Sequence, residues 1–255
     1  MNFQIDDIVE AARAGGEVVR KYFGETLEVF QKSSVGDLKT RADVESEKII
    51  LELLKKKYPT VNYYSEESGR VENESEYTFV TDPLDETNNF VMGIPDFSVS
   101  IGLLKSNQPI LGVIYNPILD QVFRAEKGKG AYLNDKKINV NQENNIQMAT
   151  VGFVSGYNTG KEYAENIKGR LKEMDIKRLI DHWAPAYDFC LLAWGKIEGM
   201  VVVDDDLEDF VAGKVILAES GAKITDLKGE IGLDSSCNFI VSNGSEIHEK
   251  LLTVI

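Results

Sequence analysis

Hydrophobic positions in the first half of the chain predict two helices followed by a run of strands. Apolar residues recur at helical spacing over residues 5–23, and a second helix is expected between Asp43 and Pro59. Short apolar runs bounded by turn residues then predict strands at 62–64, 77–80, 97–104, 109–115 and 121–125. This order predicts antiparallel hairpins covered by the two N-terminal helices.

In the second half of the chain, strands alternate with helices. Strands are expected at 149–154, 176–180, 199–203, 222–225 and 239–241, and helices at 162–174, 186–194, 210–218 and 246–252. Alternation of this kind predicts an α/β layer. The chain becomes polar around residues 141–145, so we expect an N-terminal α+β lobe at 1–143 and a C-terminal α/β lobe at 144–255, joined in one compact unit.

Composition narrows the class of partner. The chain has 255 residues, is 43% hydrophobic and carries a net charge of −14, which argues against a nucleic-acid backbone or an anionic membrane surface as the main partner. Two cysteines and two histidines cannot build a disulfide framework or a histidine-rich metal site. The start of the chain lacks the basic-then-apolar order of a signal peptide, and no apolar run reaches membrane-spanning length, so we expect a cytoplasmic protein.

The strongest chemical signal follows the apolar run at 77–80. Asp82 and Asp85 are separated by Pro83 and Leu84, so a stiff turn holds two acids side by side. The two charges repel unless a divalent cation makes both of them ligands. Thr87 and Asn88 then favour a helix start, where backbone amides suit a phosphate. The alternative interpretation is an exposed acidic turn with a helix cap.

Three further acidic features are ambiguous on their own. Glu66 follows a short strand, and a neighbouring strand could bring it beside Asp82. The acidic run at 204–209 fits a solvated face, but Asp209 precedes small residues that would let a helix approach another backbone closely. Asp43 is interpretable as a helix N-cap.

Taken together, these pieces resemble the inositol monophosphatase family of metal-dependent phosphatases. That family shows Glu-Glu after a strand, then D-P-x-D-G-T-x-N-F, then a distant D-x-x-A-G that opens a helix. The resemblance extends along nearly the whole chain. The matching segments are Glu66-Glu67, Asp82–Phe90, Asp209–Gly213, Lys32-Ser33-Ser34, Thr40–Asp43, Ser98–Gly102, Gly112–Pro117 and Ala218–Gly221.

The resemblance implies a layered αβαβα sandwich, a homodimer, and two or three Mg²⁺ ions as cofactors. One Mg²⁺ would be held by Glu66, Asp82 and the carbonyl of Leu84. A second would be held by Asp82, Asp85 and Asp209, and Glu66 would also position a weaker third ion. Most of these ligands fall in the N-terminal lobe.

The same resemblance implies the catalytic and substrate-binding roles. Thr87, paired with Asp43, would orient the attacking water, and Glu66 would assist through its metal ion. The backbone amides of residues 86 and 87 would receive the phosphate. The positions expected to face the substrate are Glu86, Thr87, Trp183, Ala184 and Pro185.

Several positions depart from the family pattern. The glycine after the second aspartate is Glu86, whose charge would repel a phosphate unless a cation intervenes. The family's W-D is Glu208-Asp209, its Gly-Ser/Thr-Ala stretch is Trp183-Ala184-Pro185, and a glutamate that helps to hold inositol falls on about Val202. Trp183 is interpretable either as a stacking surface for a ring-bearing substrate or as an ordinary exposed or core side chain.

The expected function is therefore Mg²⁺-dependent hydrolysis of a small phosphate monoester, such as an inositol monophosphate or a sugar phosphate, by metal-activated water. Fructose-1,6-bisphosphatase, histidinol-phosphatase and nucleotide 3′-phosphatase activities are alternatives within the same superfamily. A second alternative is a catalytically impaired regulatory homologue, because of Glu86. The resemblance also implies sensitivity to Li⁺, a small cation that can replace Mg²⁺ at the second site.

Overall fold

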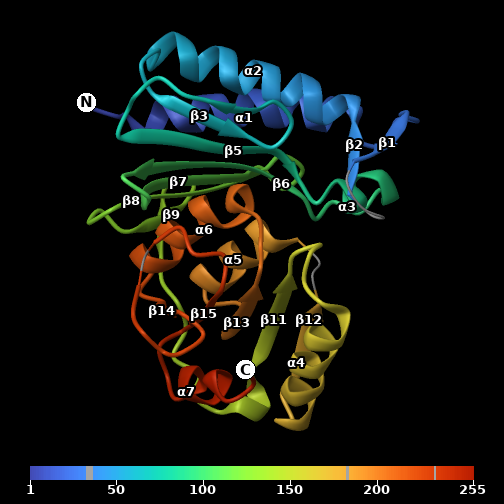
Figure 1. Ribbon diagram of the computed structural model, residues 1–255, viewed down its shortest axis with the longest axis vertical. Helices are drawn as coiled ribbons and strands as arrows, with labels where there is room; N and C mark the ends of the chain where they lie inside the picture. Colours follow the sequence, from blue (N-terminus) through green and yellow to red (C-terminus); the bar gives the residue numbers. More distant parts are fainter. Residues whose placement is uncertain (33–36, 182–183, 233) are drawn as a thin grey trace.

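The computed structural model describes residues 1–32, 37–181, 184–232 and 234–255, and Figure 1 shows them stacked in layers. Helices α1 (Ile5–Tyr22) and α2 (Arg41–Lys57) form the outermost layer over a large sheet. Helices α5 (Pro185–Ala193) and α6 (Leu207–Glu219) lie beneath that sheet, followed by a smaller sheet and by α4 (Lys161–Glu173) and α7 (Ile247–Leu252). This arrangement confirms the predicted αβαβα sandwich.

The large sheet is mostly antiparallel, as predicted. Its strand order in the described part of the chain is β10-β9-β8-β7-β6-β5-β3-β4, and only the β3–β5 pair is parallel. The strands are β3 (Asn62–Ser65), β4 (Gly69–Val71), β5 (Tyr77–Asp85), β6 (Ser98–Lys105), β7 (Gln108–Asn116), β8 (Gln121–Glu126), β9 (Ala131–Leu133) and β10 (Lys136–Ile138).

The two N-terminal helices cover one face of this sheet and touch each other closely. A Cβ atom on Gly15 would lie 2.6 Å from the side chain of Ile50 in α2, and one on Gly16 would lie 2.6 Å from Tyr115 in β7. Gly15 therefore permits the close crossing of the two helices, and Gly16 lets α1 approach the sheet closely. Buried side chains between the helices and the sheet form one core, which includes Ile8 and Phe79.

Helix α6 packs closely against the opposite face of the large sheet, because glycines in the two contacting strands leave room for it. A Cβ on Gly112 of β7 would lie 2.3 Å from the carbonyl oxygen of Ala212, and one on Gly102 of β6 would lie 2.4 Å from Val211. On the other side of α6, a Cβ on Gly213 would lie 2.6 Å from Phe189 of α5. These contacts fix the position of the helix that carries Asp209.

The smaller sheet belongs to the second half of the chain and has the order β12-β11-β13-β15-β14 among the described residues. Its parallel part is β12 (Arg178–Asp181), β11 (Thr150–Ser155) and β13 (Gly199–Val203), and its antiparallel part is β15 (Phe239–Ser242) and β14 (Lys223–Thr225). Helices α4 and α7 cover its outer face. The division into lobes at residues 143 and 144 stays a prediction.

Smaller elements complete the fold. They are β1 (Val29–Gln31), β2 (Leu38–Thr40), α3 (Thr87–Met92) and a 3₁₀ turn (Ile146–Met148). Strands β1 and β2 pair with each other in antiparallel fashion. In the described ranges we find no helix with the length and apolarity needed to cross a bilayer.

Among the element boundaries that differ from the predictions, those of β5 and α6 bear most directly on function. Strand β5 continues through Asp85, whereas the apolar run ends at Val80, because Asp82 and Asp85 pair with Ser100 and Ser98 of β6 on either side of a register shift. Helix α6 begins at Leu207, three residues before the predicted start, so Asp209 lies in its first turn. The N-cap of α2 is Thr40, with Asp43 completing a capping box three residues later.

Candidate active site

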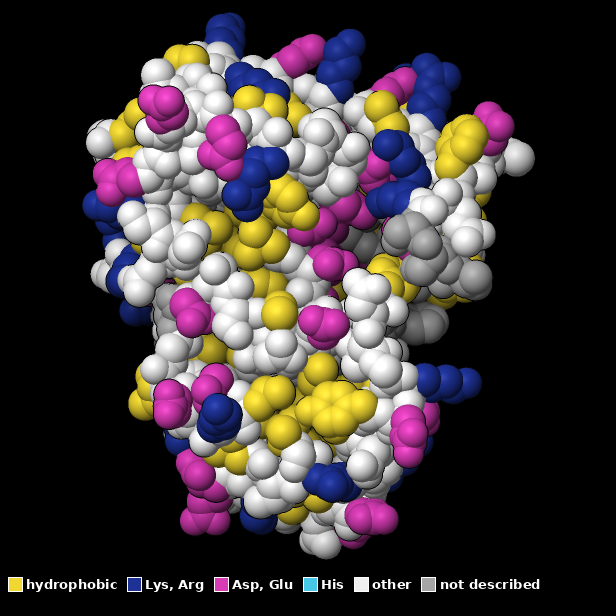
Figure 2. Space-filling view, in the orientation of Figure 1, with side chains coloured by type: hydrophobic (Ala, Val, Ile, Leu, Met, Phe, Trp, Pro, Cys, Tyr) yellow, Lys and Arg dark blue, Asp and Glu magenta, His cyan; other side chains and the backbone are white. Residues whose placement is uncertain are grey.

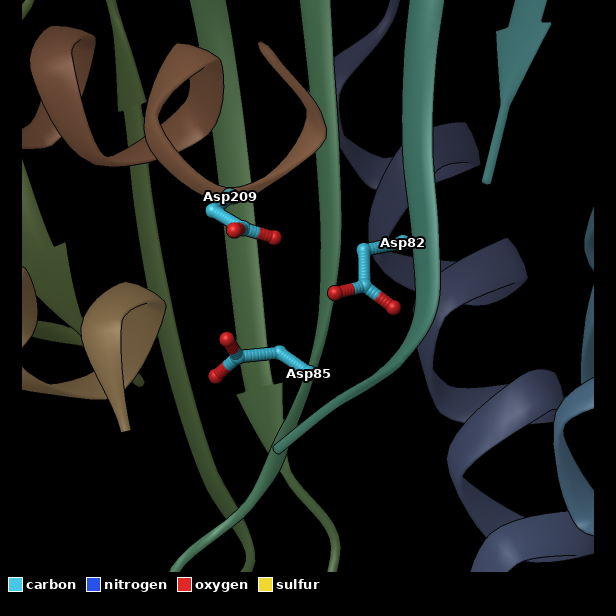
Figure 3. A group of neighbouring side chains, drawn as sticks. All are labelled: Asp82, Asp85 and Asp209. Carbon is cyan, nitrogen blue, oxygen red and sulfur yellow. The ribbon is translucent and has the colours of Figure 1, made fainter. Parts of the chain in front are cut away.

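Three aspartates from distant parts of the chain meet at one point. Asp82 and Asp85 come from the end of β5, and Asp209 comes from the first turn of α6 (Figure 3). Each offers a carboxylate oxygen, and these three oxygens lie within 4.8 Å of one another. The irregular pairing between Asp82 and Asp85 turns both side chains of one strand toward the same space.

The protein alone does not balance the charge of this cluster. Burial, followed by the neighbouring Glu66 and Asp85, raises the pKa of Asp82 well above its ordinary value. Burial and then Asp205 and Asp82 raise the pKa of Asp209 in the same way. Carboxylates that lose solvent and face like charges favour the protonated form, unless a cation is present.

Glu66 lies beside this cluster, as the parallel pairing of β3 with β5 requires. Its backbone N–H donates to the carbonyl of Thr81 at 3.2 Å, and its Oε2 is buried with no hydrogen-bond partner. Burial raises the pKa of Glu66 to about 7, although Lys32 opposes that shift by pairing with the carboxylate. The Lys32 ammonium also pairs with Glu67 at 2.7 Å.

Thr87 and Asp43 are joined as the resemblance implied. The hydroxyl of Thr87 lies 2.9 Å from Oδ1 of Asp43 and 3.2 Å from the carbonyl oxygen of Leu84. The other oxygen of Asp43 accepts hydrogen bonds from the backbone N–H of Thr40 at 2.8 Å and from its hydroxyl at 2.6 Å. Asp43 is therefore fully engaged at the start of α2 and holds Thr87 in one orientation.

Glu86 occupies a backbone conformation that suits glycine. Its φ is +68°, in the left-handed region, and it immediately precedes α3. Burial, with a smaller contribution from Asp96, raises the pKa of its carboxyl to about 7. A side chain at this position therefore carries both a conformational cost and an electrostatic cost.

These residues line one cavity of about 260 Å³, and Figure 2 shows acidic side chains gathered in a hollow between the upper and lower halves of the molecule. Asp82, Leu84, Asp85, Thr87 and Asp209 all face it, together with Glu66, Glu86 and Pro185. Ala184 is fully buried at the start of α5, and Trp183 lies outside the described residues. Val202 is fully buried in the core of the smaller sheet and does not line the cavity.

Sequence reasoning did not assign several residues to this cavity. Its lining also includes Lys32, Asp37, Asn88, Gly156, Tyr157, Asn158, Asp205, Asp206 and Glu208. For the last three, the run of acids at 204–209 was the available signal, but Asp205 and Glu208 are buried rather than on a solvated face. The loop at 156–158 has an ordinary composition, and nothing in the sequence marks it.

The donor set fits a hard divalent cation. The converging atoms are carboxylate oxygens, Leu84 also lines the cavity, and the described part of the cavity offers neither histidine nor cysteine. Mg²⁺ takes oxygen ligands of this kind and keeps several waters. The unpartnered Oε2 of Glu66 supplies a further acceptor at the edge of the cluster.

Comparisons with known proteins agree with this geometry. Residues 4–255 match the inositol monophosphatase family. The chain is 34% identical to inositol monophosphatase 2 of Solanum lycopersicum, over 88% of each chain, and 33% identical to a fructose-1,6-bisphosphatase/inositol-1-monophosphatase of Aquifex aeolicus, over 96% of this chain and 92% of the other.

A solved structure shares the whole fold. The extragenic suppressor protein suhB of Bartonella henselae superposes with a TM-score of 0.90 at 30% identity, covering 98% of this chain and 96% of the other. Sequence and structure thus agree over nearly the full length. The chain belongs to the inositol monophosphatase family.

Proposed function

We propose that this protein hydrolyses a small phosphate monoester with the help of two or three Mg²⁺ ions. The family is metal-dependent. The main support for the proposal is that Asp82, Asp85 and Asp209 converge beside the Thr87–Asp43 pair. Glu66, Asp82 and the Leu84 carbonyl would hold one ion, and the three aspartates a second. Bound Mg²⁺ would neutralise the phosphate and acidify the attacking water.

The residues of the chain would position the reactants. The Thr87 hydroxyl, held by Asp43, would orient a water toward the phosphorus, and Glu66 would assist through its metal ion. The backbone amides of residues 86 and 87 would donate to the phosphate oxygens. Glu86 and Pro185, which line the cavity, would contribute to the surroundings of the alcohol group, and the same role for Trp183 and Ala184 stays a prediction from the resemblance.

The substrate class is the finer part of the proposal. An inositol monophosphate or a sugar phosphate fits the family, and the name of the Aquifex relative adds fructose 1,6-bisphosphate. Histidinol phosphate and a nucleotide 3′-phosphate are further candidates. A regulatory role with weak catalysis is the alternative, and it is favoured by Glu86 and by the suppressor name of the Bartonella protein.

A phosphate-release assay on these substrates, with Mg²⁺ or with EDTA, tests the proposal. We expect hydrolysis that requires Mg²⁺ and is lost in Thr87→Val, which removes the hydroxyl at similar volume. Thr159→Val is the matched control, because the Thr159 hydroxyl donates to the Val203 carbonyl at 3.3 Å and Thr159 is not among the described residues that line the cavity. If none of the substrates were hydrolysed with Mg²⁺ present, the result would support the regulatory alternative.

Replacing Glu86 with glycine is expected to raise kcat/KM for phosphate monoesters about tenfold and the stability of the protein by about 1 kcal/mol. The activity gain follows because a carboxylate no longer faces the incoming phosphate. The stability gain follows because glycine adopts a φ of +68° without strain. Steady-state kinetics and thermal unfolding measure the two effects separately.

Glu86→Gln is the matched control for that variant. It removes the charge and keeps the left-handed side chain, so it should reproduce the activity gain and only the electrostatic part of the stability gain, because the strain at a φ of +68° remains. If neither variant exceeds the parent in kcat/KM, the charge of Glu86 does not limit turnover. Sensitivity to Li⁺ should be compared in the same variants.

The family resemblance also supports a homodimer and a cytoplasmic location. Light scattering during size-exclusion chromatography tests the first, and a mass near 57 kDa is expected because one chain has a mass of 28.5 kDa. A monomer across the concentration range used for the assays would contradict it. Fractionation of the source cells tests the location.

A further inference from the structure

The cavity holds more negative charge than its proposed metal sites use. Nine acidic residues line it, and the only described basic residue in the lining is Lys32. Four of the acids are proposed metal ligands. The Lys32 ammonium is already committed, since it lies within pairing distance of Asp37, Glu66 and Glu67.

The surplus charge is concentrated where β13 leads into α6. Asp205 and Glu208 are 4% and 7% exposed, and both line the cavity with Asp206. The Oδ2 of Asp205 and the Oε2 of Glu208 are buried and have no hydrogen-bond partner. An unpaired buried acceptor is costly, and a cluster of them points to a missing donor.

The protein only partly compensates for this cost. Asp206 is the N-cap of α6, where the helix dipole eases a negative charge, and the Tyr64 side chain stabilises the ionised Glu208 carboxyl. The orphan oxygens of Asp205 and Glu208 remain after both contributions.

A metal ion is a less suitable partner for these oxygens than a group with N–H donors. Within the described residues, the set of three or more acids whose oxygens converge within 4.8 Å is Asp82, Asp85 and Asp209. The surplus acids do not converge in this way. They would instead surround a larger cation that brings several N–H donors, and a protonated amine has three.

We propose that the preferred substrate is a phosphate monoester that also carries a protonated amine, such as an amino-sugar phosphate or a phosphorylated amino alcohol. The phosphate would lie at the Asp82–Asp85–Asp209 cluster, and the ammonium would donate to Asp205, Asp206 and Glu208. This inference rests on the proposed phosphatase function and specifies its substrate class. It also explains how so acidic a cavity would attract its ligand.

Matched pairs of substrates test the proposal. Glucosamine 6-phosphate and glucose 6-phosphate differ by an ammonium in place of a hydroxyl, as do O-phosphoethanolamine and 2-hydroxyethyl phosphate. N-acetylglucosamine 6-phosphate removes the charge. We expect the amine in at least one pair to have a kcat/KM about tenfold or more above its hydroxyl partner, and the acetylated sugar to lose that advantage.

The variants Asp205→Asn and Glu208→Gln should bring the amine-to-hydroxyl ratio close to one. Asp204→Asn is the matched control, because Asp204 is exposed, does not line the cavity and has a φ of +56° that asparagine tolerates. Binding of the same pairs can also be measured by calorimetry with Ca²⁺ in place of Mg²⁺, while phosphate release is monitored. The dissociation constants give a readout that does not need turnover.

The outcomes separate the two proposals. Hydrolysis with no amine preference in either pair, or a preference that survives both cavity variants, overturns the ammonium site and leaves the phosphatase intact. Tighter binding of amines without hydrolysis of any ester supports the ammonium site and overturns the phosphatase. If Asp205→Asn lowers Mg²⁺ affinity without changing the ratio, Asp205 serves the metal and the ammonium site is wrong.

Discussion

Asp209→Asn should lower kcat/KM about a thousandfold or more and, at the same time, stabilise the metal-free protein. Activity falls because the variant loses a metal ligand, and metal charge supplies several kcal/mol of transition-state stabilisation. Stability rises because burial and then Asp205 and Asp82 disfavour the ionised form of Asp209, as its raised pKa shows. Phosphate-release kinetics and thermal unfolding in EDTA measure the two effects.

Asp135→Asn is the control for charge alone, since the Asp135 side chain is fully exposed. Asp135→Asn should change neither kcat/KM nor the unfolding temperature in EDTA. Asp209→Asn with activity within tenfold of the parent would show that this carboxylate is not a metal ligand. A lower unfolding temperature in EDTA would show that the aspartate makes a favourable contact in the metal-free state.

In EDTA, the protein should lose stability as the pH rises from 6 to 8, with a fall of about 5–10 °C in the unfolding temperature. Burial, partly opposed by Lys32, raises the pKa of Glu66 to about 7, and burial with Asp206 raises that of Asp205 to about 8, whereas both groups titrate near 4 when unfolded. The folded state thus binds more protons in this window, so unfolding becomes easier as the pH rises through both pKa values.

Saturating Mg²⁺ should abolish most of that slope, because the ion replaces the protons on the clustered carboxylates. It should also raise the unfolding temperature, and by more at pH 8 than at pH 6. Differential scanning calorimetry at the two pH values, with EDTA and with Mg²⁺, provides the four measurements needed. A stability in EDTA that rises with pH would mean that these carboxyls are ionised and favourably paired without metal.

Much of this architecture could be predicted from the pattern of apolar residues. The hairpins of the large sheet and the alternation in the second half follow from periodicity, which reports the buried face of each element. The exceptions are polar stretches that tertiary contacts order. Strand β5 runs on through Asp82 and Asp85 because β6 pairs with it, and α6 begins at Leu207 inside an acidic run that resembles a solvated loop.

The candidate site was predictable only where a motif carried it. The proximity of Asp209 to Asp82 depends on glycines in β6, β7 and α6 that seat the helix on the sheet, and no local pattern gives that distance. The Asp43–Thr87 contact likewise joins residues from different elements. Tyr157 enters the cavity from a loop with no distinguishing composition, so only the folded chain identifies it.

The three clustered aspartates come from two different layers of the fold, and this has a mechanical consequence. Asp82 and Asp85 belong to the large sheet, whereas Asp209 belongs to the helix layer packed between the sheets. An ion shared by them would tie together segments that are far apart in the sequence, as a reversible cross-link does. Removing the ion would then let the strand end and the helix start separate, and amide exchange at both should quicken together.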